Sequence, residues 1–533
     1  MRARRWIVAL ALPLVLAACT TPGASSGANA SGGAAASGGA AASGGTLVMA
    51  LSAEPDVLDP TLANTFPARI VFTSFCEKLY DTNETLSLVP QLAADVPQVS
   101  PDGLTVTIPL RQGVKFNDGT PFNAEAVKTS LDRHRTLKGS ARTKELASVQ
   151  DVTVVDPNTV RLTLKYPFTP LGAQLADRAG LIMSPTALQQ LGDNFGTAPV
   201  CVGPFKFQSR TSGSEIVFTK STDYYDADKV KLDGVTYRII TDPNVRRANL
   251  ESGDVQAAER ITATDAIALK NSPDVTIQDV DTIAYQAVSI NVGNTTGTAT
   301  PTGQATTPLG QSALLREAFE LSLDRNAINK VVFADSNAVD CLPLPLQSQF
   351  RPSDPQCTPY DPERARQLIA QSGVPTPIPV NLMVPAGNEG PRTAEVIAGM
   401  AKDVGFDVRI NQQEFVSALS AARAGQFDAF LIGWSGRIDP DGNINDLVTT
   451  GGSNNFSGLS DPQVDDLAKR AAAATDQAER ADLYGQTIRR VKELRSVIYL
   501  YHDAWFLGTS KNLQGVVYYP DGIPRFKTAS LAG

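Results

Sequence analysis

The sequence predicts an α/β fold divided between two lobes, and three observations lead to this prediction. The chain has 533 residues, roughly two to three times the size of a common domain, so more than one core is expected. Hydrophobic residues make up 42% and charged residues 19%, a composition typical of a folded protein. From about residue 287 onward, short apolar strands alternate with amphipathic helices, which is the α/β pattern.

The first part of the body carries strands, turns and a helix with clear local signals. Residues 46–51 form a short apolar strand. Asn123 is placed to cap a helix, because its side chain can accept a backbone N–H of the first turn. Residues 152–155 and 160–164 flank an Asp-Pro-Asn turn, which predicts a hairpin.

The second part of the body is built from helices and buried strands in turn. Residues 314–333 predict a single helix with apolar residues at helical spacing. Asp361 followed by Pro362 predicts the start of another helix, and Gly373 predicts its end. Short apolar runs predict strands at residues 380–384, 407–411, 429–433 and 496–501.

These patterns set the expected domain boundaries. Lobe one covers residues 46–286 and holds an inserted subdomain at about residues 86–190. Lobe two covers residues 287–503, and residues 504–533 return to lobe one. Because the chain then crosses between the lobes more than once, the crossings have the geometry of a hinge.

The first 18 residues predict a secretion signal. Three arginines precede the apolar stretch Ile7–Ala17, which is too short to span a bilayer as a stable helix. The stretch ends in Leu-Ala-Ala followed by Cys19, which resembles the lipobox of bacterial lipoproteins, where the cysteine receives a lipid. A plain secretory signal with an incidental cysteine is the alternative.

Residues 19–45 predict a lipidated cysteine followed by a tether. Of residues 20–45, 22 are Gly, Ala or Ser, and such a segment cannot bury enough apolar surface to order itself. A flexible chain of this length has a root-mean-square span of about 28 Å. We therefore expect an extracytoplasmic body held to the cell membrane through Cys19.

Charge and histidine content exclude several classes of function. The formal net charge is −8 and no segment is strongly basic, so a nucleic-acid partner is not expected. His134 and His502 are the only histidines, which rules out a His-rich metal site. We expect His134 to be solvated between two arginines, and His502 to have a structural role.

Four cysteines remain in the exported body. Cys76, Cys201, Cys341 and Cys357 allow three pairings in an oxidising compartment. Cys341 and Cys357 flank a proline-rich loop and are close in sequence, so we pair them, which leaves Cys76 with Cys201. Four buried thiols are the alternative.

Several segments resemble the extracellular solute-binding proteins of ABC importers, in particular the peptide/nickel-binding family, family 5. The resemblance runs from residue 46 to the C-terminus, and its motifs occur in the family's order. The segments that carry it are Gly113–Arg133, Val202–Phe205, Asn249–Ala257, Leu315–Ile328 and Phe427–Asp439.

The resemblance implies a two-lobed periplasmic-binding-protein clamp with an extra subdomain in lobe one. It also implies that ligand binds between the lobes of a monomer and that closure is recognised by a membrane permease and its ATPase. The expected ligand is a peptide or an amino-acid-derived solute. Such a receptor needs only a higher affinity in its closed state, with no catalytic residue, cofactor or metal.

The expected ligand edge follows the strand that ends near Trp434, because ligands bind beyond the carboxyl ends of strands in open α/β sheets. Peptide receptors of the family carry an aspartate shortly after this tryptophan, where it pairs with the peptide amine. Here Arg437 stands in that place, next to Ser435, and Asp439 follows two residues on. We expect Arg437 to bind a ligand carboxylate, and Asp439 to bind an amine or to orient Arg437. A purely structural Arg437–Asp439 pair is the alternative.

Three further residues are candidates for the site. Trp434 either stacks on the ligand or seals the lobe. Asn455 either supplies amide hydrogen bonds or belongs to a turn, and Tyr501 lies near the predicted hinge strand.

A secreted hydrolase and a solute sensor that does not transport are the alternative functions. The sequence lacks the S-x-x-K pattern, and its one G-x-S-x-G pattern, Gly23–Gly27, falls within the tether. The sequence does not distinguish a transport receptor from a solute sensor of the same fold.

Overall fold

The computed structural model describes residues 44–298, 303–387 and 389–532. These residues belong to one compact unit, Ala41–Gly533. The predicted signal, Cys19 and all but the last two residues of the predicted tether lie outside the described residues. Within the described part, no helix is both long and apolar enough to cross a membrane.

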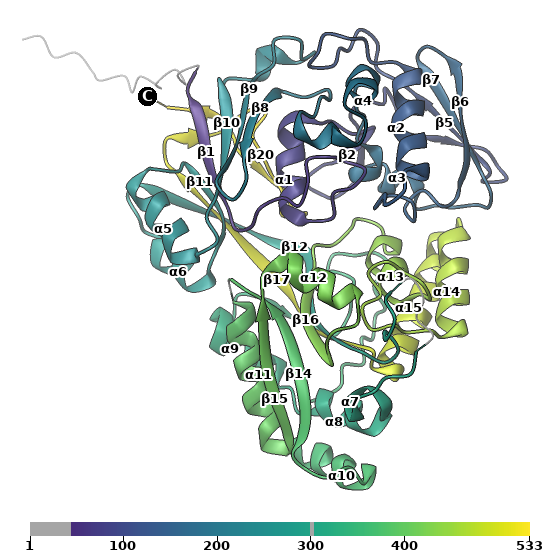
Figure 1. The fold of residues 1–533 in the computed structure, drawn as a ribbon, viewed down its shortest axis with the longest axis vertical. Coiled ribbons are helices and arrows are strands. Elements are labelled where there is room, and N and C mark those ends of the chain that lie inside the picture. Colours follow the sequence, from purple (N-terminus) through teal and green to yellow (C-terminus); the bar gives the residue numbers. More distant parts are fainter. Residues whose placement is uncertain (1–43, 299–302, 388, 533) are drawn as a thin grey trace, which may run out of the picture. The chain divides into compact units, whose positions relative to one another are not determined.

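A mixed 11-stranded sheet runs through the unit (Figure 1). Its order is β15-β14-β16-β12-β17-β11-β1-β10-β9-β8, with β13 paired to β17. Strand β14 pairs in parallel with β15 and β16, whereas β12 and β17 are antiparallel to each other. The strands are β1 (Thr46–Leu51), β8 (Phe205–Thr211), β9 (Glu215–Lys220), β10 (Gly234–Ile239), β11 (Ala257–Ile261), β12 (Val275–Ile290), β13 (Ala338–Val339), β14 (Ile378–Pro385), β15 (Phe406–Gln413), β16 (Ala429–Trp434) and β17 (Val497–Ser510).

Strands β12 and β17 are the longest in the sheet and lie side by side through its middle (Figure 1). Their far ends pack in different cores: Val275 of β12 packs with β11 side chains, and Ile290 with β14 side chains. We expected a strand of residues 496–501, but β17 continues to Ser510, because its later part pairs with β12 on one side and β11 on the other. The two strands therefore connect the two halves of the sheet.

The hydrophobic cores follow the same division. The largest core contains side chains from Leu47 to Tyr237, joined by C-terminal side chains from Leu507 to Ala529. A second core gathers side chains of β14, β16 and the helices around them, and a third lies under the last two helices. The lobe boundaries given above stay a prediction.

A four-stranded sheet of order β4-β5-β7-β6 lies apart from the large sheet, with α2 against it. The predicted hairpin is confirmed as β6 and β7. Asn123 caps α2 as predicted, because its side chain accepts the Ala126 backbone N–H at 3.1 Å. The remaining strands are β2 (Tyr80–Thr82), β3 (Leu88–Pro90), β4 (Gln98–Val99), β5 (Thr105–Pro109), β6 (Val149–Asp156), β7 (Thr159–Leu164), β18 (Leu513–Gln514), β19 (Val517–Tyr518), β20 (Pro524–Arg525) and β21 (Ser530–Leu531).

The single helix predicted at residues 314–333 is two helices, α8 and α9. Asp324 interrupts it, because its side chain accepts the Ala327 N–H at 3.0 Å and starts a new helix. The helices are α1 (Phe66–Phe75), α2 (Ala124–Thr136), α3 (Leu171–Gln174), α4 (Pro185–Leu191), α5 (Pro243–Ser252), α6 (Ala263–Leu269), α7 (Pro308–Gln311), α8 (Ala313–Leu321), α9 (Arg325–Phe333), α10 (Pro362–Ser372), α11 (Gly390–Val404), α12 (Phe415–Arg423), α13 (Asp441–Val448), α14 (Pro462–Ala473) and α15 (Gln477–Leu494).

Two disulfides are present, Cys76–Cys201 and Cys341–Cys357, the same pairs that we chose from the sequence. The expectation that His134 is solvated is wrong: its side chain is fully buried. Its two ring nitrogens contact the Thr61 hydroxyl at 2.9 Å and the Leu181 carbonyl at 3.1 Å. Burial lowers the pKa of His134 to about 4.

Candidate ligand-binding site

A cavity of about 640 Å³ lies beyond the carboxyl ends of the parallel strands β14, β15 and β16. We call it the strand-end cavity. Its walls also include Ser52, which follows β1, and Phe66 at the start of α1, so both halves of the sheet contribute. This is the position in which open α/β sheets bind ligands.

The charged wall of the strand-end cavity includes the Arg260 guanidinium, the buried carboxyl group of Asp503 and the partly buried carboxyl group of Glu389. Arg260 lies 3.4 Å above the Trp505 ring and 5.7 Å from the Phe66 ring centroid. Burial raises the pKa of Glu389 and that of Asp503, while the Arg260 charge opposes both shifts. Acids outnumber bases on this wall, so it suits a cationic group.

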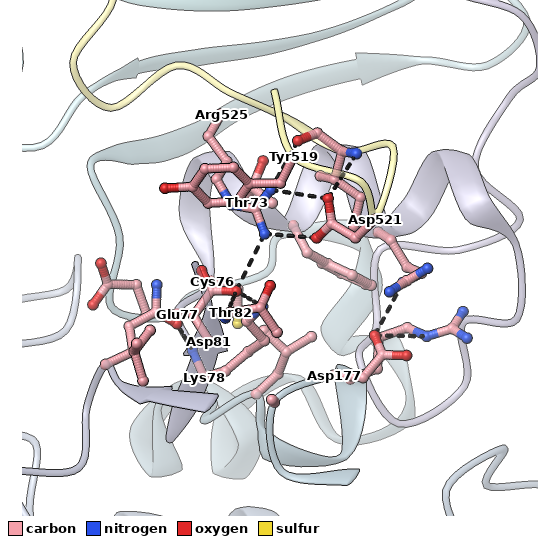
Figure 2. Close-up of a pocket in the computed structure, with 18 of the residues that line it drawn as sticks. Thr73, Cys76, Glu77, Lys78, Asp81, Thr82, Asp177, Tyr519, Asp521 and Arg525 are labelled. Carbon is pink, nitrogen blue, oxygen red and sulfur yellow. Dashed lines mark hydrogen bonds and ion pairs between the residues drawn. The ribbon is translucent and has the colours of Figure 1, made fainter. Parts of the chain in front are cut away.

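A second cavity, of about 290 Å³, lies between α1, the segment around β2 and the C-terminal loop (Figure 2). We call it the arginine cavity. Arg525 lines this cavity, and its Nη2 lies 2.7 Å from an Asp521 carboxylate oxygen and 3.3 Å from an Asp81 carboxylate oxygen. Asp177 and Arg437 lie on its wall.

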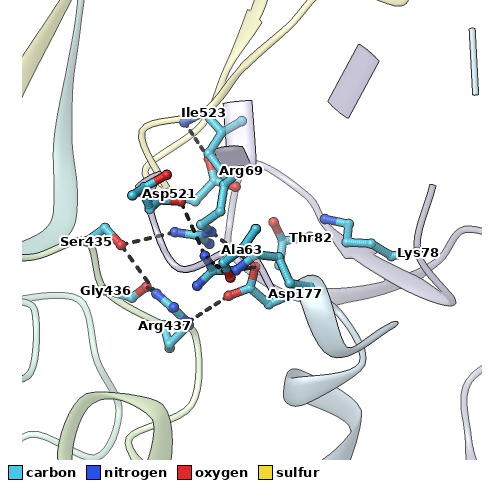
Figure 3. Close-up of polar contacts among 12 residues, drawn as sticks. Ala63, Arg69, Lys78, Thr82, Asp177, Ser435, Gly436, Arg437, Asp521 and Ile523 are labelled. Carbon is cyan, nitrogen blue, oxygen red and sulfur yellow. Dashed lines mark hydrogen bonds and ion pairs between the residues drawn. The ribbon is translucent and has the colours of Figure 1, made fainter. Parts of the chain in front are cut away.

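Arg437 contacts Asp177 instead of Asp439. Its Nε lies 2.7 Å from an Asp177 carboxylate oxygen, and its Nη1 donates to the Gly436 carbonyl at 2.7 Å and the Ser435 hydroxyl at 3.3 Å. Arg69 approaches the same carboxylate from α1, at 3.1 Å (Figure 3). Because Asp177 and Arg437 are 260 residues apart in sequence, no local spacing could have paired them.

Asp439 is bound by Arg480 of α15. One Arg480 nitrogen donates to both Asp439 oxygens, at 2.9 and 3.0 Å. The Arg480 guanidinium also lies 5.0 Å from the Phe350 ring centroid. The structural Arg437–Asp439 pair that we gave as an alternative is therefore not formed, because Asp439 pairs with Arg480 and Arg437 with Asp177.

The other candidate residues lie in three different places. Trp434 ends β16, donates its Nε1–H to the Gly442 carbonyl at 3.0 Å and lies under the Arg437 guanidinium at 4.6 Å. Tyr501 lines the strand-end cavity from β17. Asn455 is fully buried, and its amide bonds backbone carbonyls of its own turn, as the turn alternative predicted.

The residues of the two cavities that the sequence reasoning missed include Arg69, Asp177, Arg260, Glu389 and Asp503. Arg69 carried a usable signal, because it is the one charge in the otherwise apolar α1 segment FPARIVFTSF. Asp177, Arg260 and Glu389 lie in polar surroundings in the sequence and carried none.

Comparison with known proteins shows relatives over nearly the whole chain. The glutathione-binding protein GsiB of Pectobacterium atrosepticum is 29% identical over 505 residues, which cover 91% of this chain and 94% of that protein. GsiB of Escherichia coli K12 is also 29% identical, over 506 residues.

Solved structures show the same fold. The Helicobacter pylori binding protein DppA in complex with peptide STSA has a TM-score of 0.83 at 22% identity, covering 92% of this chain and 99% of that one. AgaA of A. tumefaciens R10, in complex with agropinic acid, has a TM-score of 0.81 at 27% identity with the same coverage. These are two-lobed periplasmic binding proteins, as we expected from the sequence.

The model of the bacterial extracellular solute-binding proteins, family 5, matches residues 87–455. That range is more than half of the chain. Proteins of this family bind solutes for transport and are not enzymes. The chain belongs to family 5 of the bacterial extracellular solute-binding proteins.

Proposed function

We propose that this protein is the lipid-anchored, substrate-binding component of an ABC importer. It captures a peptide or an amino-acid-derived solute and delivers it to a membrane permease. The observation that carries the proposal is the strand-end cavity, which lies at the carboxyl ends of three parallel strands and has walls from both halves of the sheet.

The charges of the two cavities support a solute that has both an amine and a carboxylate. Glu389 and Asp503 supply carboxyl groups for an amine in the strand-end cavity. Arg437, on the wall of the arginine cavity, supplies a guanidinium for a carboxylate. Gly433 lines the first cavity and Arg437, four residues further along the chain, lines the second, so the same segment contacts both cavities.

The names of the relatives agree with this class of ligand. Glutathione, agropinic acid and a short peptide are the solutes named for GsiB, AgaA and DppA. The departure at Arg437, where the family's peptide receptors carry an acid, favours a solute with an additional acidic group over an ordinary dipeptide.

Mass spectrometry of solute released from the purified protein tests the ligand class. We expect a small molecule that carries at least one amine and one carboxylate. A neutral sugar or an apolar lipid would contradict the proposed class. Isothermal titration with the identified solute then gives its affinity.

Labelling of cells with a radioactive fatty acid tests the anchor at Cys19. We expect label on the wild-type chain and none on Cys19→Ser. Solute uptake in cells that lack the chain separates transport from sensing, because a sensor leaves the rate of uptake unchanged.

A further inference from the structure

Asp177 is a single carboxylate surrounded by arginines. Arg69 lies 3.1 Å from it, Arg437 2.7 Å and Arg178 3.9 Å. These four residues line the arginine cavity (Figure 3). Asp177, Arg69 and Arg178 are each at most 8% exposed, so water solvates these charges poorly.

A fourth arginine adds to this group. Arg142 is 1% exposed, and it donates to the same Ala63 carbonyl as Arg178. Its own carboxylate partner is Glu145. Four arginines and two acids leave a surplus of 4 − 2 = +2 in a largely buried cluster.

Other acids near the cluster are held by other cations. Asp81 and Asp521 contact Arg525, and Asp81 also contacts Lys78. Asp439 is bound by Arg480. The Nε of Arg178 is buried and makes no hydrogen bond within the described residues. The surplus is therefore not offset by these acids.

Buried charge of one sign is costly unless a counter-ion pairs with it. The pKa of Arg178 is lowered to about 9, by burial and by its neighbour Arg142. The pKa of Arg437 is lowered to about 10, chiefly by burial, with the charges of Arg69 and Arg142 also lowering it. Burial is the largest cause of both shifts, and the charges of neighbouring arginines add to it.

We propose that the Asp177 cluster is an anion subsite for a dicarboxylate end of the solute, with Asp177 as an internal carboxylate for which the ligand competes. This rests on the proposed solute-binding function and narrows its substrate class. Two ligand carboxylates balance the surplus of two positive charges. Arg69 of α1 and Arg437, which follows β16, contact different oxygens of Asp177, and planar guanidinium groups are suited to binding a ligand carboxylate.

Glutarate, a simple dicarboxylate, is the probe for this subsite. Thermal unfolding of the purified protein is followed with increasing glutarate, with butyrate and sodium chloride at equal ionic strength as references. We expect saturating glutarate to raise the unfolding midpoint by about 1–3 °C more than either reference. Equal shifts with glutarate and butyrate would overturn the requirement for two carboxylates.

Two variants change the cluster in opposite directions. Arg69→Met removes one positive charge, and we expect it to weaken the glutarate response at least fivefold. Asp177→Asn removes the competing carboxylate, and we expect half-maximal response at a several-fold lower glutarate concentration. If Arg69→Met does not fold, Arg178→Met replaces it.

Arg366→Gln on α10 is the matched control, because Arg366 is an exposed arginine far from the cluster in sequence, where it contacts Glu363 and the Asp403 carbonyl. It should respond to glutarate as the wild type does. The same response in all variants would overturn the subsite. If the proposed function is wrong but the subsite is real, mass spectrometry will identify a neutral solute, while the purified protein will still bind glutarate.

Discussion

Two ion-pair regions border the short segment between β16 and α13, and they differ in their balance of charge. Arg480 of α15 and Asp439 of this segment form a one-to-one pair. Around Asp177, arginines outnumber acids. A balanced buried pair holds the segment in place, whereas the unbalanced cluster is where we propose that a charged group of the ligand binds.

The largest expected effect comes from breaking the balanced pair. Asp439→Ala leaves the Arg480 charge buried without its partner, since Arg480 is 5% exposed. We expect the free energy of unfolding to fall by about 3–5 kcal/mol, measured by urea denaturation. Asp466→Ala is the control, because Asp466 and Arg470 form an exposed pair worth less than about 1 kcal/mol. A similar loss of unfolding free energy in Asp439→Ala and Asp466→Ala would show that the buried Arg480–Asp439 pair is no more important than an exposed pair.

The next effect concerns Asp441, which lies beside Asp439 in the balanced region. Burial, and then the Asp439 charge, raise the pKa of Asp441 to about 7. Between its usual pKa near 3.8 and pH 7, the folded state therefore holds a proton that the unfolded state has lost. The contribution of Asp441 to the free energy of unfolding is therefore fully present below pH 3.8, and it is lost as the pH rises to about 7.

Asp441→Asn removes this dependence. We expect the variant to be more stable than the wild type at pH 8 by about 4 kcal/mol, with the difference disappearing towards pH 4. Urea denaturation at a series of pH values measures it. His134 contributes in the opposite sense between about pH 6.5 and 4, but it is present in both proteins and cancels in the difference. A constant difference across pH would contradict the raised pKa.

Much of the fold could be predicted from local patterns. The Asn123 cap, the β6–β7 hairpin and the α10 start at Pro362 all depend on neighbours within a few residues. The lengths of β12 and β17 could not, because they depend on pairing with each other and with β16 and β11, which are distant in the sequence. The prediction that His134 is solvated was wrong for the same reason. Its neighbours in the sequence are arginines, but in the fold its ring contacts Thr61 and Leu181.

The site divides in the same way. The strand ending at Trp434 and the charged segment after it could be located in the sequence, because a strand followed by a polar loop is a local signal. The partners of Arg437 and Asp439 could not be assigned. Asp177 and Arg480 come from elsewhere in the chain, and only the tertiary fold decides which charge each one meets.

A smaller effect on stability, but a large one on binding, is expected in the unbalanced cluster. Arg437→Met keeps most of the apolar stem and removes one of the positive charges around Asp177. We expect the affinity for the co-purified solute to fall at least tenfold, about 1.4 kcal/mol, while the free energy of unfolding changes by less than about 1 kcal/mol. Titration calorimetry and urea denaturation measure the two quantities. Affinity within twofold of wild type would show that Arg437 is structural, like Arg480.

The smallest expected effect tests whether Trp434 belongs to the loop or to the ligand. Its Nε1–H donates to the Gly442 carbonyl, and its ring lies under the Arg437 guanidinium. Trp434→Phe keeps an aromatic ring and removes the donor, so we expect a loss of about 1 kcal/mol in stability and an affinity within about threefold of wild type. Trp434→Leu, which also removes the aromatic face, should lower affinity further if the ring positions Arg437. If both variants bind as the wild type does, Trp434 only closes the turn between β16 and α13, and the orientation of Arg437 depends on Asp177 and Ser435.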